Sequence, residues 1–174
     1  MQHRLKSHPV AALLLAAICG LSAGGALAHG SKPHDQTPAP LHKEQQVFGI
    51  AGDSAKVERT IDIAMSDDMR FTPSNIRVRE GETVRLRVRN LGAVLHELVI
   101  GTREDLDKHA ELMRRFPDMQ HDEPQMSHVP PGQRGEIVWQ FNRVGEFEFA
   151  CLIAGHYQAG MRGTITVTPR STRP

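Results

Sequence analysis

Three side chains that bind soft metal ions lie close together near the C-terminal end of the sequence. Cys151, His156 and Met161 follow one another at intervals of five residues in the stretch "CLIAGHYQAGM". A thiolate and an imidazole suit zinc as well as copper, whereas a thioether favours copper and above all Cu(I). The spacing therefore predicts one side of a soft-metal site. The glycines between the three residues would let the loop fold tightly around an ion.

A further ligand has to come from another part of the chain. Two histidines and one cysteine with a weak axial methionine make a type 1 copper centre. The best candidate for the second histidine is His96, which starts the short apolar run "HELVIG". Taken singly, Met161 could be a core residue and Cys151 a buried hydrophobe. Together with His156 and His96 they favour a metal site.

The N-terminus predicts export from the cytoplasm. Residues 1–28 carry Arg4 and Lys6, then an apolar run at 10–21, then Ala26-Leu27-Ala28. Positive start, apolar run and small-x-small motif in this order are typical of a secretory signal peptide, and an uncleaved signal anchor is the alternative. Cleavage after Ala28 would leave 19 basic and 20 acidic residues, a net charge of −1. Nothing in that charge points to nucleic acid or an anionic membrane as a partner.

The same cleavage would reduce the number of cysteines from two to one. The chain has two cysteines, Cys19 and Cys151, and Cys19 would leave with the signal peptide. A lone cysteine in an oxidising compartment is an intermolecular partner, a free thiol or a metal ligand. We therefore expect a periplasmic protein, with no membrane segment after cleavage, in which Cys151 is free to bind metal.

Short strands dominate the rest of the sequence. We expect residues 29–55 to be a poorly ordered segment rich in proline and histidine, residues 56–169 to fold as one domain, and residues 170–174 to be a tail. Apolar residues alternate with arginines on both sides of Glu80-Gly81-Glu82, which predicts a hairpin-like pair of strands across residues 76–90. Regularly spaced short strands predict an antiparallel β-sandwich or barrel.

One helix interrupts the strands. Thr102 can cap it, and Leu106, Ala110 and Met113 would form its apolar face, with Phe116-Pro117 at its end. The helix and the polar loop after it form a long insertion between the strand at residue 96 and the strand at residue 139. A long connection in a small domain is usually functional or mobile.

The sequence resembles the cupredoxins, the small blue-copper β-sandwiches. The segments that carry the resemblance are "LHELVIG", "GEFEFAC" and "CLIAGHYQAGMRGTITV", within a match that covers residues 57–168. The resemblance implies an all-β Greek-key sandwich with one short helix and a long Met/His-containing loop. It also implies that His96, Cys151 and His156 are the equatorial copper ligands and Met161 the axial one.

Longer segments are similar to the periplasmic copper-resistance cupredoxins of bacteria. They are "MRFTPSNIRVREGETVRLRVRNLGAVLHELVIGT", "HAELMRRFPDMQHDEPQMSHVPPG" and "GEIVWQFNRVGEFEFACLIAGHYQAGM". This resemblance implies a role in copper tolerance, by binding, buffering or redox handling of copper. The alternative is an electron carrier between redox partners. We expect a monomer whose partners are copper ions and, in the carrier case, a periplasmic redox protein.

Enzymatic functions fit the sequence less well. A dinuclear copper centre of the oxidase-subunit type needs two cysteines in one loop, and only Cys151 is there. A multicopper oxidase has histidines on both sides of the cysteine, where this chain has Ala150 and Leu152. A Cys–His hydrolase would use Cys151 as nucleophile, but no accompanying pattern supports it. We expect no enzyme, with oxidation of copper ions themselves left open.

The insertion offers a second cluster of soft ligands. Met119 and His121, and again Met126 and His128, stand two residues apart, so each pair would share a face in an extended chain. Met113 could add a thioether, as could Met65 and Met69. We hypothesise that Met113, Met119, His121, Met126 and His128 capture additional Cu(I). The alternative is that these methionines cover the core and the histidines are solvated.

Two further positions have open interpretations. His29, as a free N-terminus, would present an amine and an imidazole to Cu(II), with help from His34 and His42; the alternative is a solvated tail. Glu97 follows His96 in an alternating strand, so we expect its side chain to point away from the ligand and to be solvated or paired with an arginine. In the alternative, Glu97 tunes the copper site.

Overall fold

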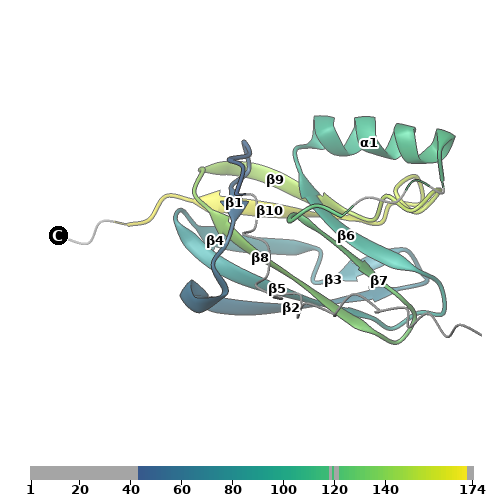
Figure 1. Cartoon of the computed structure of the whole chain (residues 1–174), viewed down its shortest axis with the longest axis horizontal. Helices are drawn as coiled ribbons and strands as arrows, with labels where there is room; N and C mark the ends of the chain where they lie inside the picture. Colours follow the sequence, from purple (N-terminus) through teal and green to yellow (C-terminus); the bar gives the residue numbers. More distant parts are fainter. Residues whose placement is uncertain (1–42, 118, 120–121, 172–174) are drawn as a thin grey trace, which may run out of the picture. The chain divides into compact units, whose positions relative to one another are not determined.

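Two five-stranded β-sheets pack face to face in the computed structural model, which describes residues 43–117, 119 and 122–171 (Figure 1). The first sheet has the order β1-β8-β5-β2-β3. Its strands are β1 (Ile50–Ala51), β8 (Arg134–Phe141), β5 (Glu82–Asn90), β2 (Arg59–Ser66) and β3 (Arg70–Thr72). The second sheet has the order β4-β10-β9-β6-β7. Its strands are β4 (Asn75–Arg79), β10 (Arg162–Thr168), β9 (Gly145–Ala150), β6 (His96–Gly101) and β7 (Met126–Val129).

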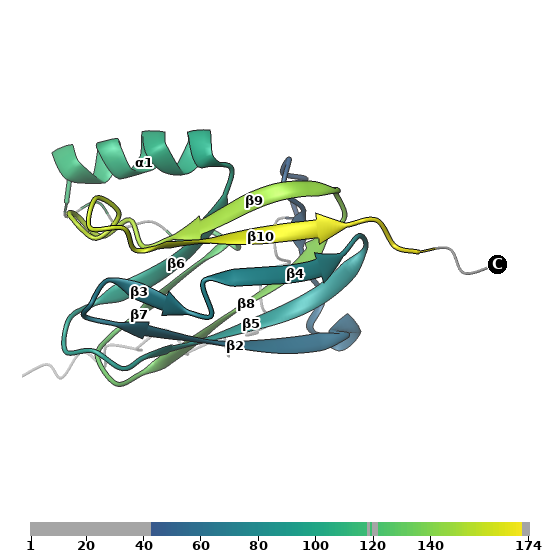
Figure 2. The same ribbon diagram turned by 180° about the vertical axis from the view of Figure 1, so that it is seen from behind.

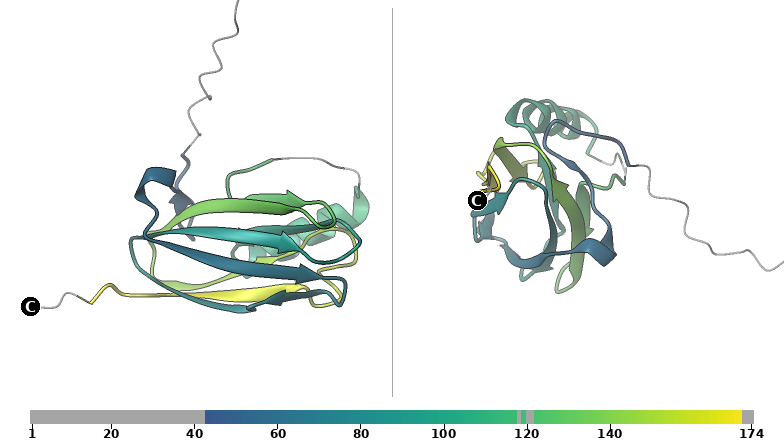
Figure 3. Two further views of the ribbon diagram at one scale, coloured as in Figure 1. Left: turned by 90° about the horizontal axis from the view of Figure 1, so that it is seen from below. Right: turned by 90° about the vertical axis from the view of Figure 1, so that its left-hand side faces the viewer.

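The predicted β-sandwich with one helix is confirmed, but its sheets are mixed and not purely antiparallel. β2 pairs with β5 in parallel, and so does β4 with β10. The remaining pairs are antiparallel, including β5–β8 in the first sheet and β6–β9 in the second. Figure 2 shows β4 beside β10, and Figure 3 shows β2, β5 and β8 running side by side. Each parallel pair joins strands that are not consecutive in sequence, because a short turn can join only antiparallel neighbours.

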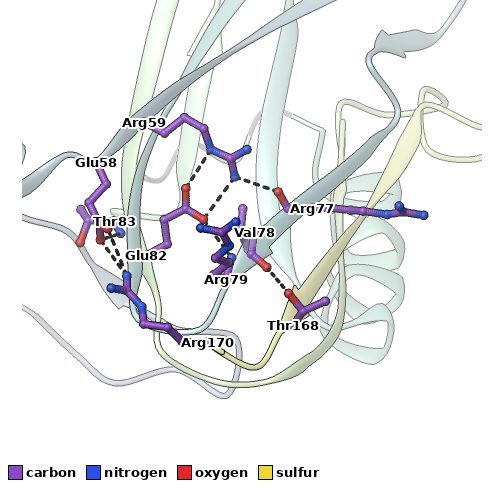
Figure 4. Close-up of polar contacts among 9 residues, drawn as sticks. All are labelled: Glu58, Arg59, Arg77, Val78, Arg79, Glu82, Thr83, Thr168 and Arg170. Carbon is purple, nitrogen blue, oxygen red and sulfur yellow. Dashed lines mark hydrogen bonds and ion pairs between the residues drawn. The ribbon is translucent and has the colours of Figure 1, made fainter. Parts of the chain in front are cut away.

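The predicted hairpin across residues 76–90 is wrong, because β4 and β5 lie in different sheets. The turn at Glu80-Gly81 carries the chain from one sheet to the other. Glu82 fixes this crossover: its Oε2 accepts the backbone N–H of Arg79 at 2.9 Å, and its Oε1 pairs with Nε of Arg59 at 2.8 Å (Figure 4). Each strand does bury one apolar face as its alternation predicts, but alternation does not identify the neighbouring strand.

The folded domain begins earlier than predicted. Phe48 is buried and stacks on Trp139, whose indole N–H donates to the Phe48 carbonyl at 3.1 Å. β1 then pairs with β8, and the 3₁₀ helix η1 (Ser54–Lys56) leads into β2. The predicted poor order is therefore wrong for residues 45–55. The proposed signal peptide (1–28), residues 29–42 and residues 172–174 lie outside the described residues.

The helix α1 (Arg103–Arg115) covers the outer face of the second sheet (Figure 1). Thr102 caps it as predicted, since its Oγ1 accepts the N–H of Asp105 at 3.1 Å. The predicted apolar face is also confirmed. The buried residues that join α1 to the sheet, here called the outer cluster, are Val99, Leu106, Ala110, Met113, Met126, Ala150 and Leu152. Among the described residues, no helix is long or apolar enough to cross a lipid bilayer.

Candidate metal centre

The structure brings three of the predicted ligands together at one end of the sandwich. His96 and Cys151 are fully buried, and His156 is half-buried. The ligand atoms of these three residues all lie within 4.8 Å of one another. Sγ of Cys151 is 3.3 Å from Nδ1 of His156, and the two imidazole rings have centroids 5.0 Å apart. A single ion can therefore contact all three side chains after small movements.

Paired strands hold the two buried ligands. His96 is the first residue of β6 and Cys151 directly follows β9, and these strands are hydrogen-bonded neighbours. The backbone N–H of Glu97 points at Sγ of Cys151, at 3.4 Å. A strand end is a rigid place for a ligand, because the sheet fixes the backbone on either side. The pairing of β6 with β9 therefore brings His96 and Cys151 together, although the two residues are distant in sequence.

The loop between Cys151 and Met161 is closed by its own backbone. The N–H of Cys151 donates to the carbonyl of Met161 at 3.0 Å, and the N–H of Met161 donates to the carbonyl of His156 at 3.1 Å. Gly155 and Gly160 both have φ of 90°, which other residues seldom adopt. The loop lies beneath α1 (Figures 1 and 2). The Tyr157 hydroxyl of this loop donates to Asp107 of α1 at 2.6 Å.

Met161 is fully buried and packs in the same core cluster as Cys151. Its backbone is hydrogen-bonded to both Cys151 and His156, so its side chain starts beside these two predicted ligands. Met65 belongs to this core cluster, and the partly buried Met69 packs against it. Their position agrees with the alternative that these two methionines cover the core.

Burial sets the protonation states of the ligands. It raises the pKa of the Cys151 thiol to about 12, with a smaller contribution from the nearby Glu97 carboxylate. Burial also lowers the pKa of His156, and the neighbouring His96 adds to the effect. The thiol is therefore neutral at pH 7 unless a cation stabilises the thiolate, and the His156 imidazole is available as a neutral ligand.

The His96 ring has the arrangement of a metal ligand. Its Nδ1 is buried and has no hydrogen-bond partner among the described residues. Its Nε2 lies 3.0 Å from Oδ1 of Asp67. A buried ring nitrogen without a partner is costly, and metal-ligating histidines commonly direct their other nitrogen at a carboxylate. The donor set of thiol, two imidazoles and a nearby thioether fits copper.

Asp67 was not identified from the sequence, because "SDDM" resembles any polar turn. Its carboxylate accepts the N–H of Ala93 at 2.7 Å in addition to its contact with His96. The hydrogen bond from Ala93, followed by that from His96, lowers the pKa of Asp67. The Asp67 carboxylate is thus an anion at neutral pH, and it is in direct hydrogen-bond contact with the predicted ligand His96.

The expected environment of Glu97 is wrong in one respect, because its side chain is buried rather than solvated. Oε1 accepts the N–H of Leu152 at 2.7 Å, and Oε2 lies 2.9 Å from Nε2 of His128. The side chain does point away from the ligand face, but on that outer face it meets the inserted segment. In the sequence, the acidic residue Glu97 within the apolar run "HELVIG" indicates a buried carboxylate that needs a hydrogen-bond partner.

The second predicted cluster divides between core and surface. Met113 and Met126 are buried in the outer cluster, whereas Met119 is 39% exposed. His128 contacts Glu97 through Nε2, and its Nδ1 lies 3.7 Å from Oδ1 of Asp122. His121 lies outside the described residues, as do His29, His34 and His42. A second metal site thus stays a prediction.

Comparisons with known proteins agree with this geometry. A profile of the family described as copper binding proteins, plastocyanin/azurin family, matches residues 56–168. Two relatives are both named copper-resistant cuproprotein CopI. The one from Rubrivivax gelatinosus is 50% identical over 139 residues, covering 80% of this chain and 82% of the relative. The one from Pseudomonas aeruginosa is 32% identical over 193 residues, covering 92% and 96%.

Among solved structures, auracyanin B has a similar fold. It superposes with a TM-score of 0.58 at 21% identity, over 70% of this chain and 96% of that protein. At this identity the likeness concerns the fold alone.

Proposed function

This chain belongs to the plastocyanin/azurin family of copper-binding proteins, and we propose that it serves copper tolerance by holding copper at the centre described above. The proposed ligands are His96, Cys151, His156 and Met161. The observation that carries the assignment is the buried Nδ1 of His96, which has no hydrogen-bond partner among the described residues and lies in the same cluster as the Cys151 thiol. The names of the relatives, copper-resistant cuproproteins, support the physiological role.

The residues of the site favour retention of an ion over turnover of a substrate. Cys151 and His96 are fully buried, which keeps water from the ligand atoms. Binding requires Cys151 to lose its proton, and the positive ion stabilises the thiolate that burial otherwise disfavours. Copper at such a site supplies a one-electron couple between Cu(II) and Cu(I). Four protein ligands leave no open position, so we propose a non-enzymatic protein.

An electron carrier is the second candidate, and one surface feature favours it. Leu91, Val94 and Leu95 are exposed in the loop that directly precedes His96. His156 is half-buried, so part of this residue is exposed to solvent. An apolar surface beside a redox site allows close approach of another protein. The partner in that case would be a redox protein, and the two functions are compatible in one molecule.

We further propose that the protein is exported to the periplasm and acts there as a monomer. The order of charged, apolar and small residues in residues 1–28 supports export. A mature net charge of −1, with histidine neutral, gives no support to a nucleic-acid or membrane partner.

Growth on copper tests the proposed role. A strain lacking the protein is complemented with the wild type or with Cys151→Ala, and both are checked for equal amounts of protein. We expect the deletion strain to be copper-sensitive and only the wild type to restore growth. Full rescue by Cys151→Ala would contradict a role for this centre, whereas a deletion strain that tolerates copper normally would favour the carrier.

A further inference from the structure

We propose that Asp67 is a positioning residue of the copper centre. Asp67 holds the His96 imidazole with Nδ1 toward Cys151, and it stabilises Cu(II) relative to Cu(I). This inference rests on the proposed ligand role of His96. Oδ1 of Asp67 lies 3.0 Å from Nε2 of His96. The His96 side chain is fully buried. When Nε2–H donates to the carboxylate, the lone pair of the neutral ring is on Nδ1.

The carboxylate is seated in a backbone cradle formed by the loop before His96. Oδ2 accepts the N–H of Ala93 at 2.7 Å. A Cβ added at Gly92 would lie 1.8 Å from Oδ1 of Asp67, so only glycine leaves room for the carboxylate there. The Asp67 carboxylate therefore contacts the backbone of this loop at Gly92 and Ala93 as well as the His96 imidazole.

Asn90 fixes the same loop from the inside of the domain. Its side chain is fully buried, and its Oδ1 accepts the N–H of Gly92 at 2.8 Å. Its Nδ2 donates to the carbonyls of Val94 and Val129, at 2.7 and 2.8 Å. The cradle is therefore anchored to β7, and its shape does not depend on Asp67 alone.

The turn that carries Asp67 is held in an unusual conformation. Met69 has φ of 59°, which is uncommon for a residue other than glycine. Its N–H donates to the carbonyl of Ser66 at 3.0 Å, which closes the turn between β2 and β3. The N–H of Leu91 also donates to the carbonyl of Met65 at 2.8 Å. Both segments that meet at the Asp67–His96 contact are thus fixed by the fold.

Two physical effects of the carboxylate act in the same direction. A carboxylate that accepts the N–H of a metal-ligating histidine makes the ring a more basic ligand. Its negative charge also favours the more highly charged ion, since the two oxidation states differ by one positive charge. Both stabilise Cu(II) more than Cu(I). Asp67 therefore lowers the reduction potential and favours retention of oxidised copper.

Reduction potentials of four proteins test this inference: the wild type, Asp67→Asn, Gly92→Ala and the control Asp68→Asn. Asp68 is the neighbouring residue of the same type in this turn, and its carboxylate accepts a hydrogen bond from the Ser66 hydroxyl. We expect Asp67→Asn to change the ratio of Cu(II) to Cu(I) affinity about tenfold toward Cu(I), a rise of about 59 mV for a one-electron couple. Gly92→Ala, which displaces the carboxylate, should move the potential in the same direction, and Asp68→Asn should change the ratio less than about twofold.

A second readout uses the metal-free protein. The ¹⁵N shifts of the His96 ring should report a single Nε2–H tautomer in the wild type and in Asp68→Asn, and a mixture in Asp67→Ala. The inference would be overturned if the wild type and Asp67→Asn had equal reduction potentials, or if Asp67→Asn and Asp68→Asn changed the potential by the same amount. An unchanged His96 tautomer in Asp67→Ala would overturn it as well. If the wild type itself forms no thiolate–copper centre, the ligand assignment has failed instead.

Discussion

Oε1 of Glu97 accepts the backbone N–H of Leu152 at 2.7 Å, so the residue after His96 is hydrogen-bonded to the residue after Cys151. The N–H of Glu97 in turn points at Sγ of Cys151. The two strand ends that carry the buried ligands are thus joined by a side chain as well as by the sheet. Oε2 extends this connection to His128 in the inserted segment.

Replacing Glu97 by alanine should destabilise the metal-free protein. The N–H of Leu152 would be left buried without its acceptor, and His128 would lose its carboxylate partner, which together cost about 1–3 kcal/mol. Urea unfolding of Glu97→Ala measures this loss. The control is Glu104→Ala, which removes an exposed pair with Lys108 and should cost about 0.5 kcal/mol or less. Equal small losses for the two variants would show that the Glu97 contacts contribute little.

The buried thiol of Cys151 predicts a loss of stability at alkaline pH in the metal-free, reduced protein. Its pKa is about 12 in the folded chain, against an ordinary value near 9. Between these values the unfolded chain loses the thiol proton while the folded chain keeps it, so the folded state is destabilised as pH rises. The slope for one such group is at most about 1.4 kcal/mol per pH unit.

The measurement is the difference in unfolding free energy between wild type and Cys151→Ala at about pH 8 and at about pH 10.5. Other groups that ionise in this range cancel in the difference. We expect the wild type to lose about 1–2 kcal/mol more than the variant over this interval. A difference that stays constant with pH would mean that the thiol is not held in its neutral form.

The inserted segment predicts Cu(I) binding that does not depend on the main centre. In a Cys151→Ala background, titration with Cu(I) against a competing chelator should still show a bound ion. Met119→Leu should weaken that binding about tenfold, since Met119 is exposed and carries a soft thioether ligand. Met113→Leu should leave it unchanged and cost less than about 1.5 kcal/mol, because Met113 is buried in the outer cluster. No Cu(I) binding in the Cys151→Ala protein would remove the second site.

Features with a local cause could be predicted from the sequence. Thr102 caps the helix, and Leu106 and Ala110 are buried on its inner face, because capping and a period of 3.6 residues act within a few residues. The grouping of His96, Cys151 and His156 was predicted from the ligand chemistry of their side chains, with His96 and Cys151 at strand ends and His156 in the loop after β9. The Gly155 backbone also has the conformation expected of a tight ligand loop.

Features that depend on tertiary contacts could not be predicted in the same way. The turn at Glu80-Gly81 resembles a hairpin turn, but β4 pairs with β10, almost the full domain away in sequence. Asp67 acts on His96 only because two separate loops meet. Phe48 lies in a segment with little to bury, yet it stacks on Trp139. In each case the partner is distant in sequence and leaves no periodic signal.

The central claim is that Cys151 and His96 bind copper in one centre, and the most direct test is metal analysis with an optical spectrum of the Cu(II)-loaded protein. We predict a strong thiolate-to-Cu(II) absorption band in the wild type and in the control Met119→Leu. The band should be absent from Cys151→Ala and altered in His96→Ala. A wild-type protein that binds copper without this band, or a band that persists in Cys151→Ala, would contradict the account.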